Sequence, residues 1–545
     1  MKTKDIRTFV IVLILTISVI PLGTNANTPS GASLWQEAVI STSIQAGSVE
    51  DYDPLCNIEV TFTLKSIRSL ERTQHLTNIN KKIDRFSDPD FYVIIWISGE
   101  KFTSPVWKNT RYLYDVNWSV TVDVPDDQEW VPIRIQLWDK NAGLDTQCDI
   151  SSLYHDKLFR NYDVELLYNI ASGHWNGDDL VNAESWYVDL SGYGRLNGCD
   201  DRSYYDSERD CELWFDVSQS DPDGDGIPYW TEVNIFKTDP EVDNTGEDFD
   251  ADGCPIEWEH KWGHQMWYDT QDQITYHWWI YDPVVTYDDH LTLDPDWDGL
   301  ENIEEYWTSQ WGSDPFRQDL FVELDEMEEG PLGRMVLFPE DSKELLRTAY
   351  HSRNIVFHLD DGCLGGGELI PFIQEPLTRE DLHDYYFNYF LHGDINNWRV
   401  GVFHYALHVY DAGWAGYVFD NGYTDHLDSL QISSKYHEMY TYKNPLYNTI
   451  RRYTLNKQSQ REMVYAAVLM HELGHTLGIF HGNTPGCDDG RTLNPWNFNY
   501  WRYAPYKSVM NYRYIYSELV DYSDGSRGRN DFDDWGRLDL TFFQR

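Results

Sequence analysis

Basic side chains are scarce in this sequence of 545 residues, where 42 Lys and Arg stand against 91 Asp and Glu, a formal net charge of −49. So acidic a chain lacks the positive surface that neutralises phosphates, and we expect no nucleic-acid partner. The same charge favours either cation binding or a salt-tolerant surface that repels other acidic molecules.

Long apolar runs are missing after the start of the chain. Basic residues precede a short apolar run at 9–20, and small residues follow it, a pattern that predicts a secretory signal peptide over 1–26, followed by a linker at 27–55. A membrane span needs about twenty apolar residues, so an uncleaved anchor is the weaker alternative. We expect a secreted or surface-associated protein, with no later segment crossing a bilayer.

Cysteines are few, at seven. In an exported protein they suggest disulfides, and an odd number leaves one unpaired. None of their spacings is that of a zinc finger, so we interpret them as structural. The predicted pairs are Cys56 with Cys148, Cys199 with Cys211, and Cys363 with Cys487, which leaves Cys254 single.

Aromatic residues make up 15% of the chain, too many for a disordered protein. A chain this long has room for about three domains. We therefore expect several packed cores rather than one.

One short segment reads HELGHTLGIFH. If 459–477 is helical, His471 and His475 lie one turn apart on one face, and both imidazoles can reach the same zinc ion. Gly478 permits a sharp turn that returns His481 as a third ligand. Three imidazoles leave one tetrahedral position for water, as a catalytic zinc site requires.

Glu472 directly follows the first of these histidines. Rather than binding the metal, it would remove a proton from the zinc-bound water, which then attacks a carbonyl carbon. A metal site that has lost its activity is the alternative, although the base and all three ligands are present.

The full pattern resembles the metzincin clan of zinc endopeptidases, whose signature is HExxHxxGxxH followed by a methionine-containing turn. The segment 508–512, SVMNY, is the candidate turn. The resemblance implies that Met510 lies beneath the metal as an apolar base. It also implies that Tyr512 reaches the metal or the transition-state oxyanion, with Tyr514 as a competitor for that role.

The region 317–545 also has the element order of such an α+β catalytic domain. Apolar patterning predicts a helix over 342–350, and strands over 319–324, 354–359, 400–410, 414–419 and 430–433. The resemblance implies that the fourth of these strands is an antiparallel edge beside the cleft. Gly416 and Tyr417 would then pair their backbone with an extended peptide substrate.

Between 219 and 316 one acidic pattern occurs three times. Alternating carboxylates can converge on one ion, glycine permits the turn, and a later glutamate supplies two further oxygens, so we expect about three structural calcium ions. The predicted ligands are Asp221, Asp223, Asp225 and Glu232; Asp248, Asp250, Asp252 and Glu259; and Asp294, Asp296, Asp298 and Glu305.

These loops resemble thrombospondin type-3 repeats more than sensor EF-hands, because Pro228, Pro255 and Glu301 occupy the position that is usually aliphatic in EF-hands. Dockerin modules are also similar, which would imply a cohesin-type partner. On the main interpretation calcium neutralises the carboxylates and stiffens a spacer.

Residues 56–218 are predicted to be β-rich, with strands at 58–65, 91–97, 118–124 and 133–138. The segment SDPDFYV at 87–93 and the run that starts at Asp139 resemble calcium loops of a C2 domain, which can contact lipids or proteins through calcium. Asn141 replaces an expected aspartate, so a generic β-sandwich is the alternative. Asn117 begins a glycosylation sequon.

Together these features favour a secreted, calcium-stabilised zinc endopeptidase that acts on proteins or peptides. The alternative of another class is a calcium-dependent adhesion or scaffolding protein with a vestigial zinc domain. An esterase or amidase that uses the same zinc-bound water is a third candidate.

Overall fold

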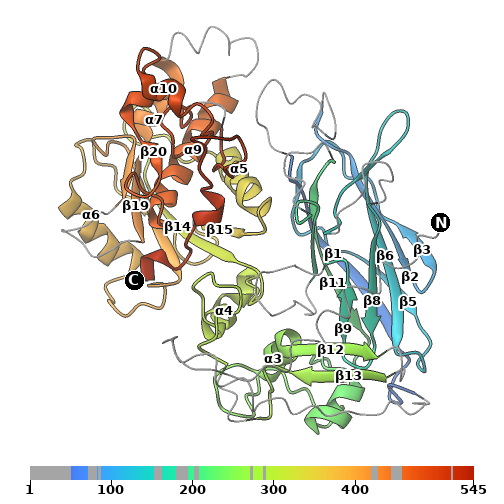
Figure 1. The fold of residues 1–545 in the computed structure, drawn as a ribbon. Helices are drawn as coiled ribbons and strands as arrows, with labels where there is room; N and C mark the ends of the chain where they lie inside the picture. The colour runs from blue at the N-terminus through green and yellow to red at the C-terminus, as the bar shows by residue number, and fades with distance from the viewer. Residues whose placement is uncertain are drawn as a thin grey trace, which may run out of the picture. The chain divides into compact units, whose positions relative to one another are not determined.

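The computed structural model describes most of the chain after the predicted linker (Figure 1). The predicted signal peptide lies outside the described residues. These are 51–71, 83, 87–152, 162–179, 194–201, 208–269, 274–285, 290–418, 428–443, 457–516 and 519–544.

Two antiparallel sheets form the first part of the chain. One has the order β10-β11-β1-β4, with β5 also paired to β1, and the other has the order β3-β2-β6-β8-β9, with β7 paired to β6. The strands are β1 Glu59–Ser69, β2 Phe91–Ile97, β3 Glu100–Thr103, β4 Tyr112–Leu113, β5 Trp118–Asp123, β6 Trp130–Asp139, β7 Thr146–Cys148, β8 Val164–Asn169, β9 His174–Gly177, β10 Gly194–Asn197 and β11 Cys211–Gln219.

Burial alternates along these strands, as expected for sheets with one face inward. Both sheets contribute to a single apolar cluster that includes Phe62 of β1, Phe215 of β11 and Ile95 of β2. The Phe62 and Phe215 rings stack with their centroids 5.5 Å apart. The region is therefore a β-sandwich, and β1, β2, β5 and β6 confirm the four predicted strands.

The acidic middle of the chain consists of loops that each lead into a short helix. A hairpin, β12 His264–Asp269 with β13 Ile274–Trp279, follows the second loop and was not predicted. The helical segments are α2 Tyr229–Thr231, η3 Glu232–Phe236, α3 Ile256–Gly263, α4 Asn302–Thr308 and η4 Ser309–Trp311.

The last part of the chain is built on a mixed sheet with the order β15-β14-β17-β19-β18 (Figure 1). All pairs are parallel except β18 with β19, so β18 is an antiparallel edge, as predicted. The strands are β14 Asp319–Met327, β15 Val356–Asp360, β17 Phe403–Val409, β18 Gly416–Val418 and β19 Ser429–Ser433, and β16 Leu369–Ile370 also pairs with β14.

Helices pack against both faces of this sheet, which explains why β14 and β17 are buried along their whole length. Val322 and Leu324 of β14 join a core with α5 Glu340–His351 and α9 Lys457–Thr476. Phe321, on the opposite face, joins a second core with α6 Arg379–Tyr385 and η5 Tyr386–Phe390. The remaining elements are α7 Ser434–Lys443, β20 Pro485–Asp488, η6 Gly490–Leu493, α10 Phe498–Arg502, η7 Trp535–Arg537 and η8 Phe542–Gln544.

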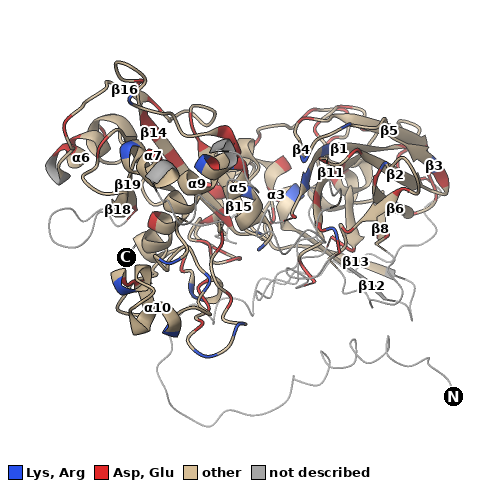
Figure 2. Ribbon diagram, turned by 90° about the horizontal axis from the view of Figure 1, so that it is seen from above, with Lys and Arg blue, Asp and Glu red and all other residues tan. Residues whose placement is uncertain are grey.

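Acidic positions are distributed over strands, helices and loops, with basic positions visibly fewer (Figure 2). Among the described residues, no helix combines the length and the apolar content that a membrane crossing requires.

The predicted disulfides are wrong, because all seven cysteines are free thiols in the structure. In the third predicted pair, Cys363 is exposed, whereas Cys487 is fully buried beside Asp488. The thiol of Cys211 instead contacts that of Cys148 in the sandwich core. The predicted pairs joined cysteines of the same region of the sequence. That criterion could not reveal this contact, because the contact depends on how the two sheets bring β7 and β11 together.

Candidate functional site

The three histidines of the zinc motif are each held by a backbone carbonyl. The Nδ1 atom of His471 donates to Val509 O at 2.9 Å, that of His475 to Ile479 O at 2.6 Å, and that of His481 to Cys487 O at 2.6 Å. A carbonyl only accepts, so each ring donates through Nδ1, which leaves Nε2 as the ring nitrogen that can bind a metal. This is how proteins orient imidazoles that bind a metal.

The two helical histidines lie on one buried face of α9. His471 is 2% and His475 is 7% exposed, and their ring centroids are 4.8 Å apart. The helix itself is fixed by its apolar face, which packs in the core shared with α5 and the sheet. This placement agrees with the predicted spacing, and a donor set of imidazoles fits zinc.

Gly478 ends the motif helix with φ +87°, a left-handed conformation that disfavours other residues. The backbone N–H of Ile479 then bonds back to Gly474 O at 2.9 Å, which closes the turn. The chain reverses here and brings His481 into the loop before β20. The structure thus gives Gly478 the turning role expected from the sequence.

The predicted methionine turn lies under α9. Met510 is fully buried, and a Cβ built on Gly474 would come within 2.7 Å of its Sδ atom. The Tyr512 ring lies 5.6 Å from that of His471. The hydroxyl of Tyr514 instead donates to Ala504 O at 2.6 Å.

Burial raises the pKa of the Tyr512 phenol, and the nearby carboxylates Asp488 and Glu472 raise it further. Tyr512 is therefore a protonated donor at neutral pH. Burial also raises the pKa of Glu472, while His471 and His475 act in the opposite direction. A raised pKa makes this carboxylate a stronger proton acceptor when ionised.

The edge strand β18 touches the predicted base directly. A Cβ built on Gly416 would lie 2.4 Å from Oε1 of Glu472, so only glycine leaves room for this carboxylate. Gly416 and Tyr417 pair on one side with Ile432 and Gln431 of β19. In the part of the chain that the structure describes, the other edge of β18 has no strand partner.

Sequence reasoning missed one residue at this site. Oδ1 of Asp488 lies 3.1 Å from Nε2 of His471, and Oδ2 lies 3.4 Å from Nε2 of His475. Asp488 follows the motif at no recognised spacing, so only the fold of β20 and the preceding loop could reveal it.

The three acidic loops have a shared geometry. The first aspartate of each accepts a hydrogen bond from the loop glycine, from Gly226 to Asp221 at 2.7 Å, from Gly253 to Asp248 at 3.0 Å and from Gly299 to Asp294 at 3.0 Å. The carboxylate oxygens of the first two loops converge within 4.8 Å. This curl agrees with the predicted cation loops.

The glutamate at the end of each loop supports a cation there. Glu232, Glu259 and Glu305 are at most 1% exposed, and each has a buried carboxylate oxygen without a hydrogen-bond partner. Burial, with the loop aspartates nearby, raises the pKa of Glu232 and of Glu259 to about 8. Such groups fit calcium, which would supply the missing partner and the missing positive charge.

The second loop contains a further group that the sequence did not indicate. Nε2 of the buried His290 lies 2.9 Å from Asp252 and 3.2 Å from Glu259. This histidine comes from the segment after the hairpin, so its contact with the loop depends on tertiary structure.

The C2-like positions of the sandwich are already engaged by protein groups. Asp139 accepts from Asp90 N at 2.8 Å and from Asn141 Nδ2 at 3.0 Å. Asp145 pairs with Lys140 at 2.8 Å. These contacts do not by themselves require a cation.

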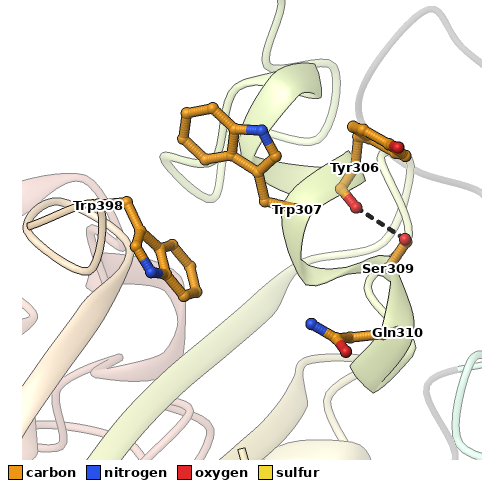
Figure 3. A pocket seen from close by; sticks show the side chains of 5 residues that line it. All are labelled: Tyr306, Trp307, Ser309, Gln310 and Trp398. Carbon is orange, nitrogen blue, oxygen red and sulfur yellow. Dashed lines mark hydrogen bonds between the residues drawn. The ribbon is translucent and has the colours of Figure 1, made fainter. Parts of the chain in front are cut away.

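A further pocket has a volume of about 630 Å³, and the histidines of the zinc motif are not among its lining residues (Figure 3). Its lining consists of Tyr306, Trp307, Ser309, Gln310 and Trp398. The Trp311 ring stacks on Trp398 with centroids 5.8 Å apart. The pocket contains none of the predicted substrate-binding residues.

No family model matches the chain, and no curated protein matches it. Among solved structures, the chain is similar to human GIVD cytosolic phospholipase A2, at 16% identity over 30% of this chain and 17% of that one, with a TM-score of 0.17. It is also similar to a C2 domain, at 10% identity over 30% and 98% of the two chains, with a TM-score of 0.17. The calcium-bound pair of C2 domains from Extended-Synaptotagmin 2 gives 14% identity over 31% and 47%, with a TM-score of 0.18.

The chain thus spans about a sixth of the phospholipase and about half of the synaptotagmin fragment. At such TM-scores the likeness does not define the domain. The strand pairing and the shared apolar core define it as a β-sandwich.

Proposed function

We propose that this protein is a zinc-dependent endopeptidase. The observation that carries the proposal is the set of three imidazoles, each fixed through Nδ1, with the Glu472 carboxylate against the open edge strand β18. Zinc held by His471, His475 and His481 would supply a Lewis acid that polarises the scissile carbonyl and acidifies water.

Protein groups would bind the substrate, transfer the proton and stabilise the oxyanion. The β18 edge holds an extended peptide by backbone hydrogen bonds, which places the scissile bond beside the base. Glu472 accepts the proton of the attacking water and passes it to the leaving amine. The protonated Tyr512 phenol donates to the developing oxyanion.

Membership in the metzincin clan is part of the same proposal. It is supported by the spacing of the histidines, the turn at Gly478, the buried Met510 and the antiparallel edge strand. Secretion is proposed from the predicted signal peptide alone. A C2-like role of the sandwich in lipid or protein contact is likewise proposed, from the SDPDFYV segment.

Cleavage of a peptide library, with the products sequenced, tests the proposal. We expect internal cuts at defined positions, which stop when a zinc chelator is added and resume when zinc is restored. Cleavage only at the ends of the library peptides would contradict an endopeptidase activity. If the mature protein with zinc and calcium cuts no peptide or unfolded protein, the adhesion or scaffolding alternative is favoured.

Replacing Gly416 by alanine is expected to lower kcat about 100-fold, because the new methyl group displaces Glu472 from the cleft, and displacements of about 1 Å have such effects. Steady-state kinetics on one library substrate measures this change in kcat. Gly490→Ala is the matched control, since a Cβ there meets nothing within 4 Å. Equal activity of the two variants would remove Gly416 from the site.

A further inference from the structure

Asp488 occupies an unusual place beside the histidines. It ends β20, and its backbone has φ +52°, in the left-handed region that few residues other than glycine, asparagine and aspartate adopt. Its N–H bonds to Met510 O at 3.2 Å, which ties β20 to the methionine turn.

The distances from Asp488 are close to those between two ligands of one ion. Tetrahedral zinc with bonds of about 2.0 to 2.2 Å separates its ligand atoms by roughly 3.3 to 3.5 Å. The Asp488 oxygens lie 3.1 Å and 3.4 Å from Nε2 of His471 and His475.

We propose that Asp488 is a protein-supplied zinc ligand that closes the coordination position left to water in a hydrolytic site. This inference rests on the proposed function and adds a regulated resting state to it. The protein then has low activity until the Asp488 side chain moves away.

Asp488 is better suited to this role than its neighbour Cys487. The Cys487 thiol lies 3.5 Å from Oδ2 of Asp488 and also belongs to the potential ligand group. However, Cys487 is fully buried, whereas the Asp488 side chain is partly exposed. The Cys487 carbonyl is already used to hold His481.

The same geometry permits release. The Asp488 side chain is 27% exposed, against 2% for His471, so rotation about its side-chain bonds can carry the carboxylate into solvent. Tyr512 contacts the carboxylate in the closed arrangement. A substrate that reaches Tyr512 therefore competes for the group that helps to hold Asp488.

Cobalt(II) substitution of the full chain tests this directly. Visible absorption reports cobalt coordination, and azide is the probe for an open position. We expect Asp488→Asn to bind azide at least tenfold more tightly than the wild type, because asparagine tolerates the left-handed backbone but ligates weakly. Asp488→Gly, which suits the same backbone, serves as a second variant.

Asp489→Asn is the matched control. It makes the same charge change at the next residue, and asparagine can still accept from Arg491 N as Asp489 does. We expect its azide affinity to equal that of the wild type. Equal azide affinity in the wild type and both Asp488 variants would overturn the proposal.

The cobalt measurement is separate from peptidase activity. If the proposed function holds, Asp488→Asn also raises kcat/KM at least tenfold in the zinc protein. If no variant cleaves any peptide but the azide affinities still differ, the peptidase proposal fails while Asp488 remains a ligand.

Discussion

Replacing Glu472 by glutamine is expected to lower kcat by about 10²- to 10⁴-fold, the range that general-base groups contribute. Glutamine keeps the shape of the side chain but cannot accept the proton of the attacking water. The three imidazoles keep their backbone partners, so zinc content should stay at one ion per motif. Steady-state kinetics and metal analysis of the same preparation measure both quantities.

Glu340→Gln on α5 is the control for this experiment. Glu340 is 80% exposed, and the change removes one charge without touching the cleft. Its kinetics should equal those of the wild type. A Glu472→Gln protein with normal turnover would refute the assigned base, and one that lost its zinc would show that Glu472 supports the site structurally.

The elements that carry this chemistry could be predicted because their signals are local. Glu472 and its neighbouring histidines follow helical spacing, Gly478 satisfies a turn that few other residues tolerate, and the strand segments are rich in apolar residues. The edge position of β18 followed from the family resemblance rather than from its three residues.

Other features depend on tertiary contacts that no spacing encodes. Asp488 and His290 meet their partners only after separate segments pack together. The carbonyls that hold the imidazoles cannot be identified from the sequence, because every residue has a backbone carbonyl. Helices α6 and α7 were missed because tyrosines, histidines and charged residues dominate them, which weakens the apolar periodicity.

Calcium removal is expected to have the largest effect on stability. Glu232, Glu259 and Glu305 each bury a carboxylate oxygen that lacks a partner, and the loop aspartates surround them. Without a cation these charges repel one another in a poorly solvated site. At calcium a hundred times above its dissociation constant, each site adds about 2.7 kcal/mol, so three sites add roughly 8 kcal/mol.

Differential scanning calorimetry with and without a calcium chelator measures this effect. We expect Tm to fall by at least about 10 °C and to recover with calcium but not with the smaller magnesium ion, which demands a stricter octahedral shell. Glu305→Gln should remove one bound calcium and part of the Tm increase. Glu241→Gln, at an exposed position between the first two loops, should change neither. An unchanged Tm and unchanged protease resistance in chelator would refute the structural role, because the buried carboxylates would then be stable without a cation.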